Sequence, residues 1–362
     1  MPRMETPRSN ALMQLLGIEL PIVQAPMAGV STPAMAAAVS NAGALGSLGV
    51  GATNAEGARE MIAKVRALSK RSLHVNVFCH VPPKADAARE AAWIERVLPT
   101  FVALKAEPPA KLTEIYKSFL EDDEMLAMLV AERPKVVSFH FGVPAAERIA
   151  ALKRAGIVLL ASATNLKEAR VCAAAGVDGV IAQGYEAGGH RGTFDADGED
   201  DQLGMMALTR LLVRELELPI LAAGGIMDGA GIAAALRLGA SAAVLGTAFI
   251  DCAESQADAG YRAALHSEAA QHTTLVRAIS GRPARCLANR FTAFGREVKV
   301  SEIPAYPIGY DLGKALNAAG KAAGEPGFGA QWAGQGAPLA RAMPAAELVR
   351  TLARELESAR QS

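Results

Sequence analysis

The sequence predicts an α/β fold, specifically a TIM (β/α)8 barrel with a helical cap. Short apolar runs recur through the first two thirds of the chain, and each is followed by an Ala-rich stretch with helical periodicity. This alternation is typical of strand and helix units around a parallel sheet. Glycines gather after the last of these runs, where barrel enzymes place their phosphate and catalytic loops. The chain of 362 residues also exceeds the roughly 250 residues of a plain barrel, which leaves room for a cap.

Eight apolar runs are the candidate strands, and several of their starts lie a little over twenty residues apart. That spacing suits one strand, one helix and two short loops. The predicted strands are Ile22 to Ala25, Ala44 to Leu48, Leu73 to Phe78, Val136 to Phe139, Val158 to Ala161, Gly179 to Ala182, Pro219 to Ala222 and Ala242 to Leu245. A doubly wound open sheet would give a similar pattern, but Gly43, Gly46 and Gly49 lack the GxGxxG spacing of a dinucleotide turn.

Two segments interrupt this rhythm. Residues 82–133 form a charged, helix-prone stretch that is too long for one crossover and predicts two or three helices. After Ile250 the chain is helical, then rich in Gly and Pro, then helical again from Pro344. We therefore expect a barrel over residues 1–250 with a helical insertion at about 82–133, a helical cap that binds substrate over 251–335, and a C-terminal helix at 336–362 that packs back on the barrel.

The composition excludes several classes of function. Thirty-seven basic residues balance 37 acidic ones, so no global field favours nucleic acid or an anionic membrane surface. The four cysteines are far apart and form no CxxC pair, which predicts reduced thiols and no metal site. No apolar run reaches about 18 residues, and the N-terminus lacks the apolar core of a signal peptide. We expect a cytoplasmic monomer or homodimer that acts on small molecules.

The first candidate site is the loop Gly188-Gly189-His190-Arg191-Gly192, which follows the sixth predicted strand. Glycines let a backbone approach a flat ligand closely, and an imidazole exchanges a proton near neutral pH. A Gly-rich turn with an exposed histidine is the structural alternative. The position after an apolar strand favours a functional loop, with His190 as the candidate catalytic residue.

Two further glycine loops follow the seventh and eighth predicted strands. They contain Ala223-Gly224-Gly225 and Leu245-Gly246-Thr247. In a barrel, the backbone amides of these loops form a phosphate site that requires no basic side chain. Either loop alone could be a tight turn that needs glycine only for packing. Together with the first loop, they predict a phosphorylated cofactor.

Polar side chains also mark the third and fourth predicted strands. Alternation puts His74, Asn76, Phe78 and His80 on one face of the third strand, and an inward Asn could bind the edge of a flat cofactor. For His74 and His80, structural hydrogen bonding or exposure is the simpler interpretation. His140 ends the fourth strand at the barrel mouth, where a site role and a structural role are equally open.

A group of phenols and one lysine lies in the predicted cap. If Pro307 starts a helix, Tyr310 and Lys314 share one face of it, with Tyr306 at its entrance. Phenols and an ammonium group would suit an anionic substrate. A surface amphipathic turn is the alternative.

Six motifs occur in an order and spacing that is specific when they are taken together. They are Gln24 to Val30 with Ser31-Thr32-Pro33, Glu186 to Phe194, Ala222 to Ile226, Gly246 to Phe249, Ser280 to Arg285 and Gln331 to Gln335. Over nearly its whole length the chain thereby resembles the nitronate monooxygenase family, formerly called 2-nitropropane dioxygenases, and specifically its class I branch. One departure is Cys286, where relatives often have glycine, which leaves the local backbone conformation in question.

The resemblance implies a TIM barrel with a helical cap, one non-covalent FMN, and oxidation of alkyl nitronates of the propionate 3-nitronate type by O2 to a carbonyl compound and nitrite. The catalytic histidine of the family matches His190. Its other active-site residues match Tyr116, His140, Tyr261, Tyr306, Tyr310 and Lys314 as substrate-binding residues. The FMN site would comprise Ala25, Pro26, Met27, Asn76, Gln183, Gly188, Gly189, Ala223, Gly224, Gly225, Leu245, Gly246, Thr247, Trp332, Gly334 and Gln335.

Two other functions are compatible with the same scaffold. An FMN-dependent NADH:quinone reductase or enoyl-ACP reductase would share the Gly-Gly-His loop, and a flavin-binding protein without turnover would share the cofactor site. The segment from His190 to Phe194, together with Tyr306, Tyr310 and Lys314, favours nitronate oxidation over the reductases. The histidine and the pocket tyrosines argue against a protein that only binds flavin.

Overall fold

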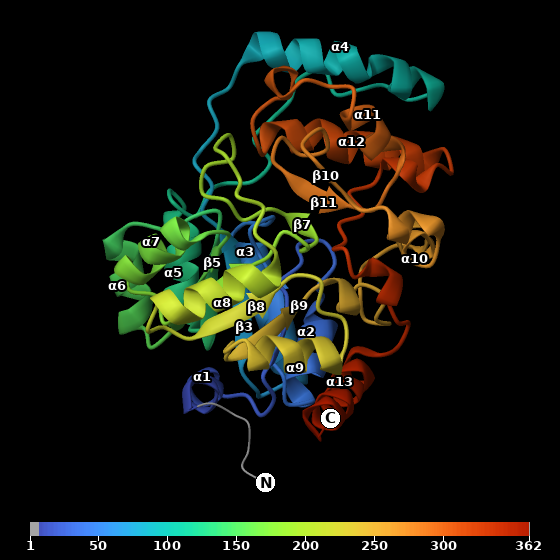
Figure 1. Ribbon diagram of the computed structural model, residues 1–362. Coiled ribbons are helices and arrows are strands. Elements are labelled where there is room, and N and C mark those ends of the chain that lie inside the picture. The colour runs from blue at the N-terminus through green and yellow to red at the C-terminus, as the bar shows by residue number, and fades with distance from the viewer. Residues whose placement is uncertain (1–6, 362) are drawn as a thin grey trace.

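Parallel strands form a barrel in the computed structural model, which describes residues 7–361 (Figure 1). Residues 1–6 and Ser362 lie outside the described range, so the expectation about a signal peptide falls partly outside it. The barrel strands are β1 (Ile22–Gln24), β2 (Gly46–Gly49), β3 (Leu73–Phe78), β4 (Val136–His140), β5 (Val158–Ala163), β6 (Gly179–Gln183), β8 (Ile220–Ala223) and β9 (Ala242–Leu245).

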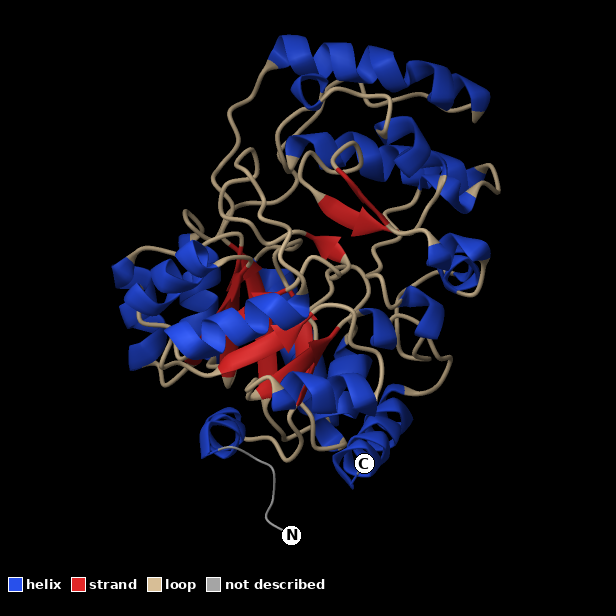
Figure 2. Cartoon of the chain, viewed as in Figure 1, coloured by secondary structure: helices blue, strands red, loops and turns tan. Residues whose placement is uncertain are grey.

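The strands follow the order β1-β9-β8-β6-β5-β4-β3-β2, and all neighbours are parallel. A parallel bridge between Val23 and Leu45 joins β1 to the segment before β2 and so closes the ring. The predicted TIM (β/α)8 barrel is therefore confirmed. Helices surround the strands (Figure 2), and they are α2 (Pro33–Asn41), α3 (Ala55–Leu68), α5 (Asp123–Glu132), α6 (Ala146–Arg154), α7 (Leu166–Ala174), α8 (Met205–Glu215), α9 (Gly229–Arg237) and α13 (Ala345–Gln361).

The eight predicted strands differ from the observed ones by at most two residues at either end, and the differences have local causes. β2 begins at Gly46 because the backbone of Leu45 already bonds to Ile22 and Gln24 of β1. β8 begins at Ile220 since Pro219 has no amide hydrogen to donate to a ladder.

Short polar side chains determine where several barrel helices start. Thr32, Asn54, Asn165 and Asp228 each accept a hydrogen bond from the amide three residues further on. A cap of this kind stabilises a helix by about 1 kcal/mol. The turns from strand to helix are therefore largely specified by local sequence.

The two ends of the barrel differ in what fills them. Helix α1 (Pro7–Leu16) lies at the lower end in Figure 1, and its Leu12 and Leu16 pack with the interior side chains Val136, Leu160 and Leu221. Aliphatic packing therefore closes the amino end of the strands. The carboxyl end faces the cap, which is where a site can form.

The cap lies over the carboxyl ends of the strands, at the top of Figure 1. Its elements are α4 (Ala87–Ala103), α10 (Ala259–Leu265), β10 (Thr274–Val276), β11 (Ala284–Cys286), α11 (Arg290–Gly295) and α12 (Ile308–Ala322), with short 3-10 turns between them, including η3 (Val300–Glu302). Strand β7 (Gly189–His190) pairs antiparallel with β11. The loop that follows β6 is thus one strand of the small sheet in the cap.

The segment 82–133 contains two helices that serve different layers. Helix α4 contacts α12 and η3, whereas α5 contacts α3 and α6. We therefore propose that α4 belongs to the cap and α5 to the barrel. At the C-terminus, α13 contacts α9 and α2. Within residues 7–361, none of the helices combines the length and apolarity that crossing a membrane requires.

Candidate active site

A pocket with an empty volume of about 1310 Å³, partly open to solvent, lies between the carboxyl ends of the strands and the cap. Its lining combines the glycine loops of the barrel with tyrosines of the cap, so one cavity brings together the two groups of residues that the sequence marked. The predicted site residues that line it are Ala25, Pro26, Met27, Asn76, Tyr116, His140, Gln183, Gly188, Gly189, His190, Ala223, Gly224, Gly225, Gly246, Thr247, Tyr261, Tyr306, Tyr310 and Trp332.

Four predicted site residues do not line the pocket. Leu245 is buried in the layer between barrel and helices. Gly334 and Gln335 lie behind the wall, and their amides donate to Thr247 Oγ1 and to the Glu186 carbonyl. Lys314 is exposed, and its Nζ lies 4.6 Å from the centroid of the Tyr116 ring. These residues support or flank the site instead of facing its interior.

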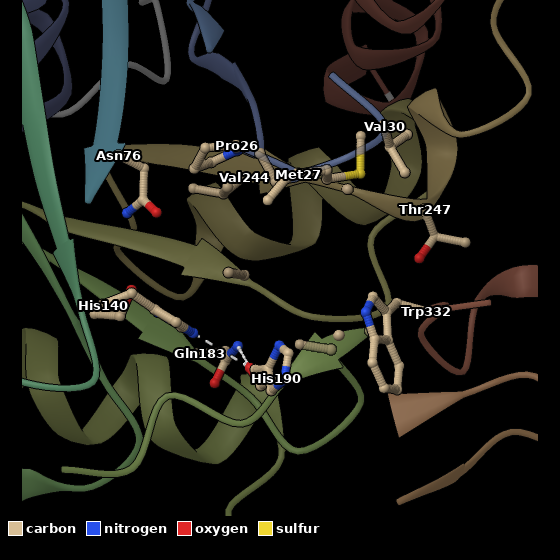
Figure 3. Close-up of a pocket in the computed structure, with 18 of the residues that line it drawn as sticks. Pro26, Met27, Val30, Asn76, His140, Gln183, His190, Val244, Thr247 and Trp332 are labelled. Carbon is tan, nitrogen blue, oxygen red and sulfur yellow. Dashed lines mark hydrogen bonds between the residues drawn. The ribbon is translucent and has the colours of Figure 1, made fainter. Parts of the chain in front are cut away.

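The pocket has two facing walls (Figure 3). Pro26, Met27 and Val244 lie on one side of the cavity, and His190 and Trp332 lie on the other. The first wall is apolar and belongs to the barrel, whereas the second carries ring side chains. A slot of this shape suits a planar aromatic ligand.

Gly188 is required where the barrel loop meets the C-terminal segment of the cap. A Cβ atom at Gly188 would lie 2.4 Å from the amide nitrogen of Gly334, and one at Gly334 would lie 2.6 Å from the Glu186 carbonyl oxygen. Both contacts are with backbone atoms, which cannot move aside as a flexible side chain would. The Gly-rich loop therefore serves close packing as well as access to the pocket.

Unbonded backbone amides lie after β8 and β9. Gly224, Gly225, Gly246 and Thr247 line the pocket, and no acceptor for their amide hydrogens is found among the described residues. These amides face the open pocket with their hydrogens uncommitted, so a ligand that accepts several hydrogen bonds fits here. A phosphate group has the acceptor oxygens for this cradle.

Asn76 presents an acceptor to the same pocket. Its Nδ2 donates to Ser138 Oγ at 2.8 Å, which fixes the orientation of the amide. The oxygen Oδ1 has no partner within residues 7–361 and can accept from a ring N–H of a bound ligand. The alternation along the third strand predicted this inward placement.

His190 lies in an aromatic environment. Its ring centroid is 5.2 Å from those of Tyr306 and Trp332 and 5.8 Å from that of Phe141. Burial, with a smaller contribution from the Arg282 guanidinium, lowers the pKa of His190 to about 3. The imidazole is therefore neutral at physiological pH and can accept a proton or a hydrogen bond.

His140 differs from His190 because both of its ring nitrogens are engaged. Nε2 lies 3.3 Å from the His190 carbonyl oxygen, and Nδ1 lies 3.0 Å from Ser162 Oγ. Burial lowers the pKa of His140 to about 4. His140 lines the pocket, but its hydrogen bonds hold the protein and leave no ring nitrogen for a ligand.

The cap contributes phenols with different hydrogen bonding. Tyr306 Oη is buried and has no partner among the described residues, and burial raises the pKa of Tyr306 well above its usual value. Tyr261 donates its hydroxyl to the Trp332 carbonyl instead. Burial raises the pKa of Tyr310 to about 12. Tyr306 is therefore a neutral donor that a ligand can use, whereas Tyr261 holds the wall.

Sequence reasoning assigned no role to three residues next to the site. Ser280 Oγ lies 2.9 Å from His190 Nε2. The Arg282 guanidinium is buried and lies 4.1 Å from the centroid of Phe141, whose φ of 75° is left-handed. The sequence signal for Ser280 and Arg282 was their motif, but no local pattern marks Phe141 for this backbone conformation.

His74 and His80 have different surroundings. His74 bonds Ser47 Oγ at 2.8 Å and Ser138 Oγ at 2.6 Å, which is the structural role expected for it. His80 is buried among aromatic rings, so the expectation of exposure is wrong for it. Its ring packs edge-on against Tyr306 because it fills space behind that phenol.

The remaining expectations concern metals and Cys286. Residues 7–361 contain no group of three or more His, Cys, Asp or Glu side chains that could hold a metal ion. Cys286 lies in β11 and pairs with Thr274, and it also forms an isolated bridge with Trp332. A regular strand needs no glycine at this position, so Cys286 fits the local backbone although relatives often have glycine there.

Comparison with known proteins identifies a family. A family model described as Nitronate monooxygenase matches residues 9–355. A Nitronate monooxygenase from Paraburkholderia phytofirmans is 63% identical over 96% of this chain and 95% of its own, and one from Pseudomonas aeruginosa is 54% identical over 96% and 99%.

Two solved structures share this fold. The structure of nitroalkane oxidase from Streptomyces ansochromogenes has a TM-score of 0.89 and 42% identity, covering 97% of this chain and 99% of that one. FabK from Thermotoga maritima has a TM-score of 0.72 and 27% identity over 97% of each chain. The chain belongs to the nitronate monooxygenase family.

Proposed function

We propose that this protein is an FMN-dependent nitronate monooxygenase that oxidises alkyl nitronates, of the propionate 3-nitronate type, with O2 to a carbonyl compound and nitrite. The observation that carries the proposal is a pocket with two kinds of lining. Unbonded backbone amides lie on its barrel side, and phenols and a neutral histidine lie on its cap side.

FMN fits the barrel side of this pocket. The amides of Gly224, Gly225, Gly246 and Thr247 would hold its phosphate, and the slot between Met27 and Trp332 would receive its ring system. Asn76 Oδ1 would accept from the ring edge. When bound, the flavin supplies the redox chemistry by taking up an electron from the nitronate and passing reducing equivalents to O2.

An anionic substrate fits the cap side. The Nζ of Lys314 lies at the rim over the Tyr116 and Tyr310 rings and would attract the nitronate from solvent. The unpartnered hydroxyl of Tyr306 would donate to it inside the pocket. Because a neutral nitroalkane must first lose its α-proton, the neutral imidazole of His190 would serve as the base for that substrate.

An oxygen-consumption assay tests this proposal. The purified protein, supplied with FMN, is mixed with propionate 3-nitronate while O2 uptake and nitrite release are followed. We expect both, without any requirement for NADH. Absence of O2 uptake with several alkyl nitronates would leave a flavin-binding protein without turnover as the better description.

A second measurement separates oxidation from the reductase alternative. Under anaerobic conditions the flavin absorbance is followed after mixing with NADH and, separately, with the nitronate. Bleaching by the nitronate alone supports nitronate oxidation. Rapid bleaching by NADH would instead favour an NADH:quinone reductase or an enoyl-ACP reductase.

A further inference from the structure

The backbone of His190 is held from two sides. Its carbonyl oxygen accepts from Gln183 Nε2 at 3.0 Å and from His140 Nε2 at 3.3 Å, as the dashed lines in Figure 3 show. The Oε1 of Gln183 accepts from the Gly192 amide at 2.7 Å, and β7 pairs with β11. The main chain is thus fixed, and the chemistry of His190 depends on which ring nitrogen carries the hydrogen.

Ser280 is the only hydrogen-bond partner of the His190 ring within residues 7–361. Its hydroxyl oxygen lies 2.9 Å from His190 Nε2 and 3.2 Å from the carbonyl oxygen of Arg282. Ser280 is fully buried, so water does not compete for the hydroxyl. A hydroxyl has one hydrogen and can donate to only one of these two atoms.

The count of donors and acceptors decides between the two arrangements. If the hydroxyl donated to His190 Nε2, the Arg282 carbonyl would have no donor among the described residues. If it donates to the Arg282 carbonyl, Nε2–H of His190 donates to the serine oxygen, and the hydroxyl, Nε2 and the carbonyl are all paired. A buried polar group without a partner costs roughly 1 to 3 kcal/mol, which favours the second arrangement.

We propose that Ser280 is a positioning residue that fixes His190 in the Nε2–H tautomer and so makes Nδ1 the proton-accepting atom of the site. Nδ1 has no partner within residues 7–361. In the reaction with a nitroalkane, the α C–H bond breaks, an N–H bond forms at Nδ1, and the electron pair passes to the nitro group to give the nitronate. Ser280 Oγ then accepts from the resulting imidazolium, whose Nε2–H is a stronger donor.

The tautomer can be measured without turnover. Histidine ring nitrogens are labelled with 15N in the holoenzyme, and the His190 signals are assigned by their loss in His190→Asn. We expect one-bond coupling to hydrogen at Nε2 and none at Nδ1. A hydrogen on Nδ1 in the unmodified protein would overturn the proposal.

Two matched variants separate positioning from packing. Ser280→Ala removes the acceptor and should give a mixture of both tautomers at His190. Ser47→Ala removes another buried serine to histidine hydrogen bond, that of His74, which does not touch His190. It should leave the His190 signals unchanged. An unaltered Nε2–H tautomer in Ser280→Ala would also overturn the proposal.

Kinetics extend the test, and this part rests on the proposed function. In Ser280→Ala, kcat/KM for a neutral nitroalkane should fall roughly tenfold or more, as expected for a misoriented general base, while kcat/KM for the nitronate changes by less than about twofold because no proton is removed. Equal losses on both substrates would contradict the positioning role. If the unmodified enzyme oxidises neither substrate, the proposed function fails while the 15N measurement still decides the tautomer.

Discussion

The two sides of the pocket offer different chemical groups to a ligand: main-chain groups on the barrel side and side chains on the cap side. The barrel side offers main-chain groups at Gly188, Gly224, Gly225 and Gly246, whose value lies in the absence of a side chain. The cap side offers Tyr306, Tyr310 and Trp332 as rings and hydroxyls. We infer that cofactor affinity depends on barrel geometry, whereas substrate selection depends on a few cap side chains. His190 belongs to both sides, since it follows β6 and pairs with β11.

Acid should weaken both sides at once, and this is the largest effect that we expect. Burial lowers the pKa of His74 and His190 to about 3 and that of His80 and His140 to about 4, against 6.5 for an exposed histidine. Between these values the unfolded chain binds protons that the folded chain does not. The stability that depends on keeping these histidines neutral is therefore fully present above about pH 6.5, and it is lost as the pH falls toward 4.

The size of this effect can be measured by urea unfolding. One such histidine loses about 2 kcal/mol between pH 6.5 and 5, so several should lower the free energy of unfolding by several kcal/mol. Unfolding curves are recorded at pH 7.5, 6.5 and 5.0 at one ionic strength. Equal urea midpoints of unfolding at pH 7.5 and 5.0 would show that these histidines become protonated in the folded protein without loss of stability. That result would contradict the view that they are kept neutral by burial.

Replacing His190 tests the residue at which the two sides meet. His190→Asn should lower kcat/KM for a nitroalkane about a thousandfold, because general base catalysis contributes roughly 100- to 10,000-fold. The nitronate needs no base and should lose far less. Both substrates are assayed by O2 uptake at equal flavin content. A similar loss on both would remove His190 from the role of base.

Gly188→Ala tests the close packing of the barrel loop against the cap segment. The added Cβ would lie 2.4 Å from the Gly334 amide nitrogen and 2.5 Å from the Ala333 carbonyl carbon, which forces the loop and the cap segment apart. We expect FMN affinity to fall about a hundredfold, equivalent to about 2.7 kcal/mol, measured by fluorescence titration of the apoprotein. Gly156→Ala is the control for backbone strain alone, since its φ of 78° is left-handed, unlike that of Gly188, but its Cβ meets nothing within 4 Å. Normal FMN affinity in Gly188→Ala would contradict the close-packing role.

Lys314→Met tests the cap side alone and has the smallest expected effect. The charge at the rim attracts an anion in a partly solvated position, so KM for the nitronate should rise about tenfold, or about 1.4 kcal/mol, with little change in kcat. FMN affinity should not change. Lys321→Met removes another lysine of α12, one that pairs with Asp258 at 2.7 Å, and serves as the control. A lower FMN affinity in Lys314→Met would show that the two sides are not independent.

Sequence reasoning located the barrel side well because its determinants are local. Asn76 faces inward by strand alternation, and the glycines after β8 and β9 follow directly from their position after apolar runs. Leu245 is the exception in this group, since the same alternation turns its side chain outward into the helix layer. The family resemblance, and no spacing argument, supplied Tyr116, Tyr261 and Trp332.

The hydrogen bonds that set the chemistry could not be predicted in the same way. Ser280 and His190 are 90 residues apart, and His140 reaches the His190 carbonyl from 50 residues away. Whether the His140 ring can bind a ligand, or is instead occupied by hydrogen bonds within the protein, depends on the partners of its two ring nitrogens. Those partners, Ser162 Oγ and the His190 carbonyl, lie on other elements of the fold.

The sequence alone therefore predicted the barrel, the positions of its strands along the chain and the glycine loops at its mouth, because periodicity, caps and glycine placement act over a few neighbouring residues. The tertiary structure decided which polar groups are left without a partner. Four such groups have no hydrogen-bond partner among the described residues: the amides of Gly224 and Gly246, the hydroxyl of Tyr306 and the Nδ1 atom of His190. Such an absence arises only when distant segments pack together, since burial makes an unpaired group costly and therefore informative.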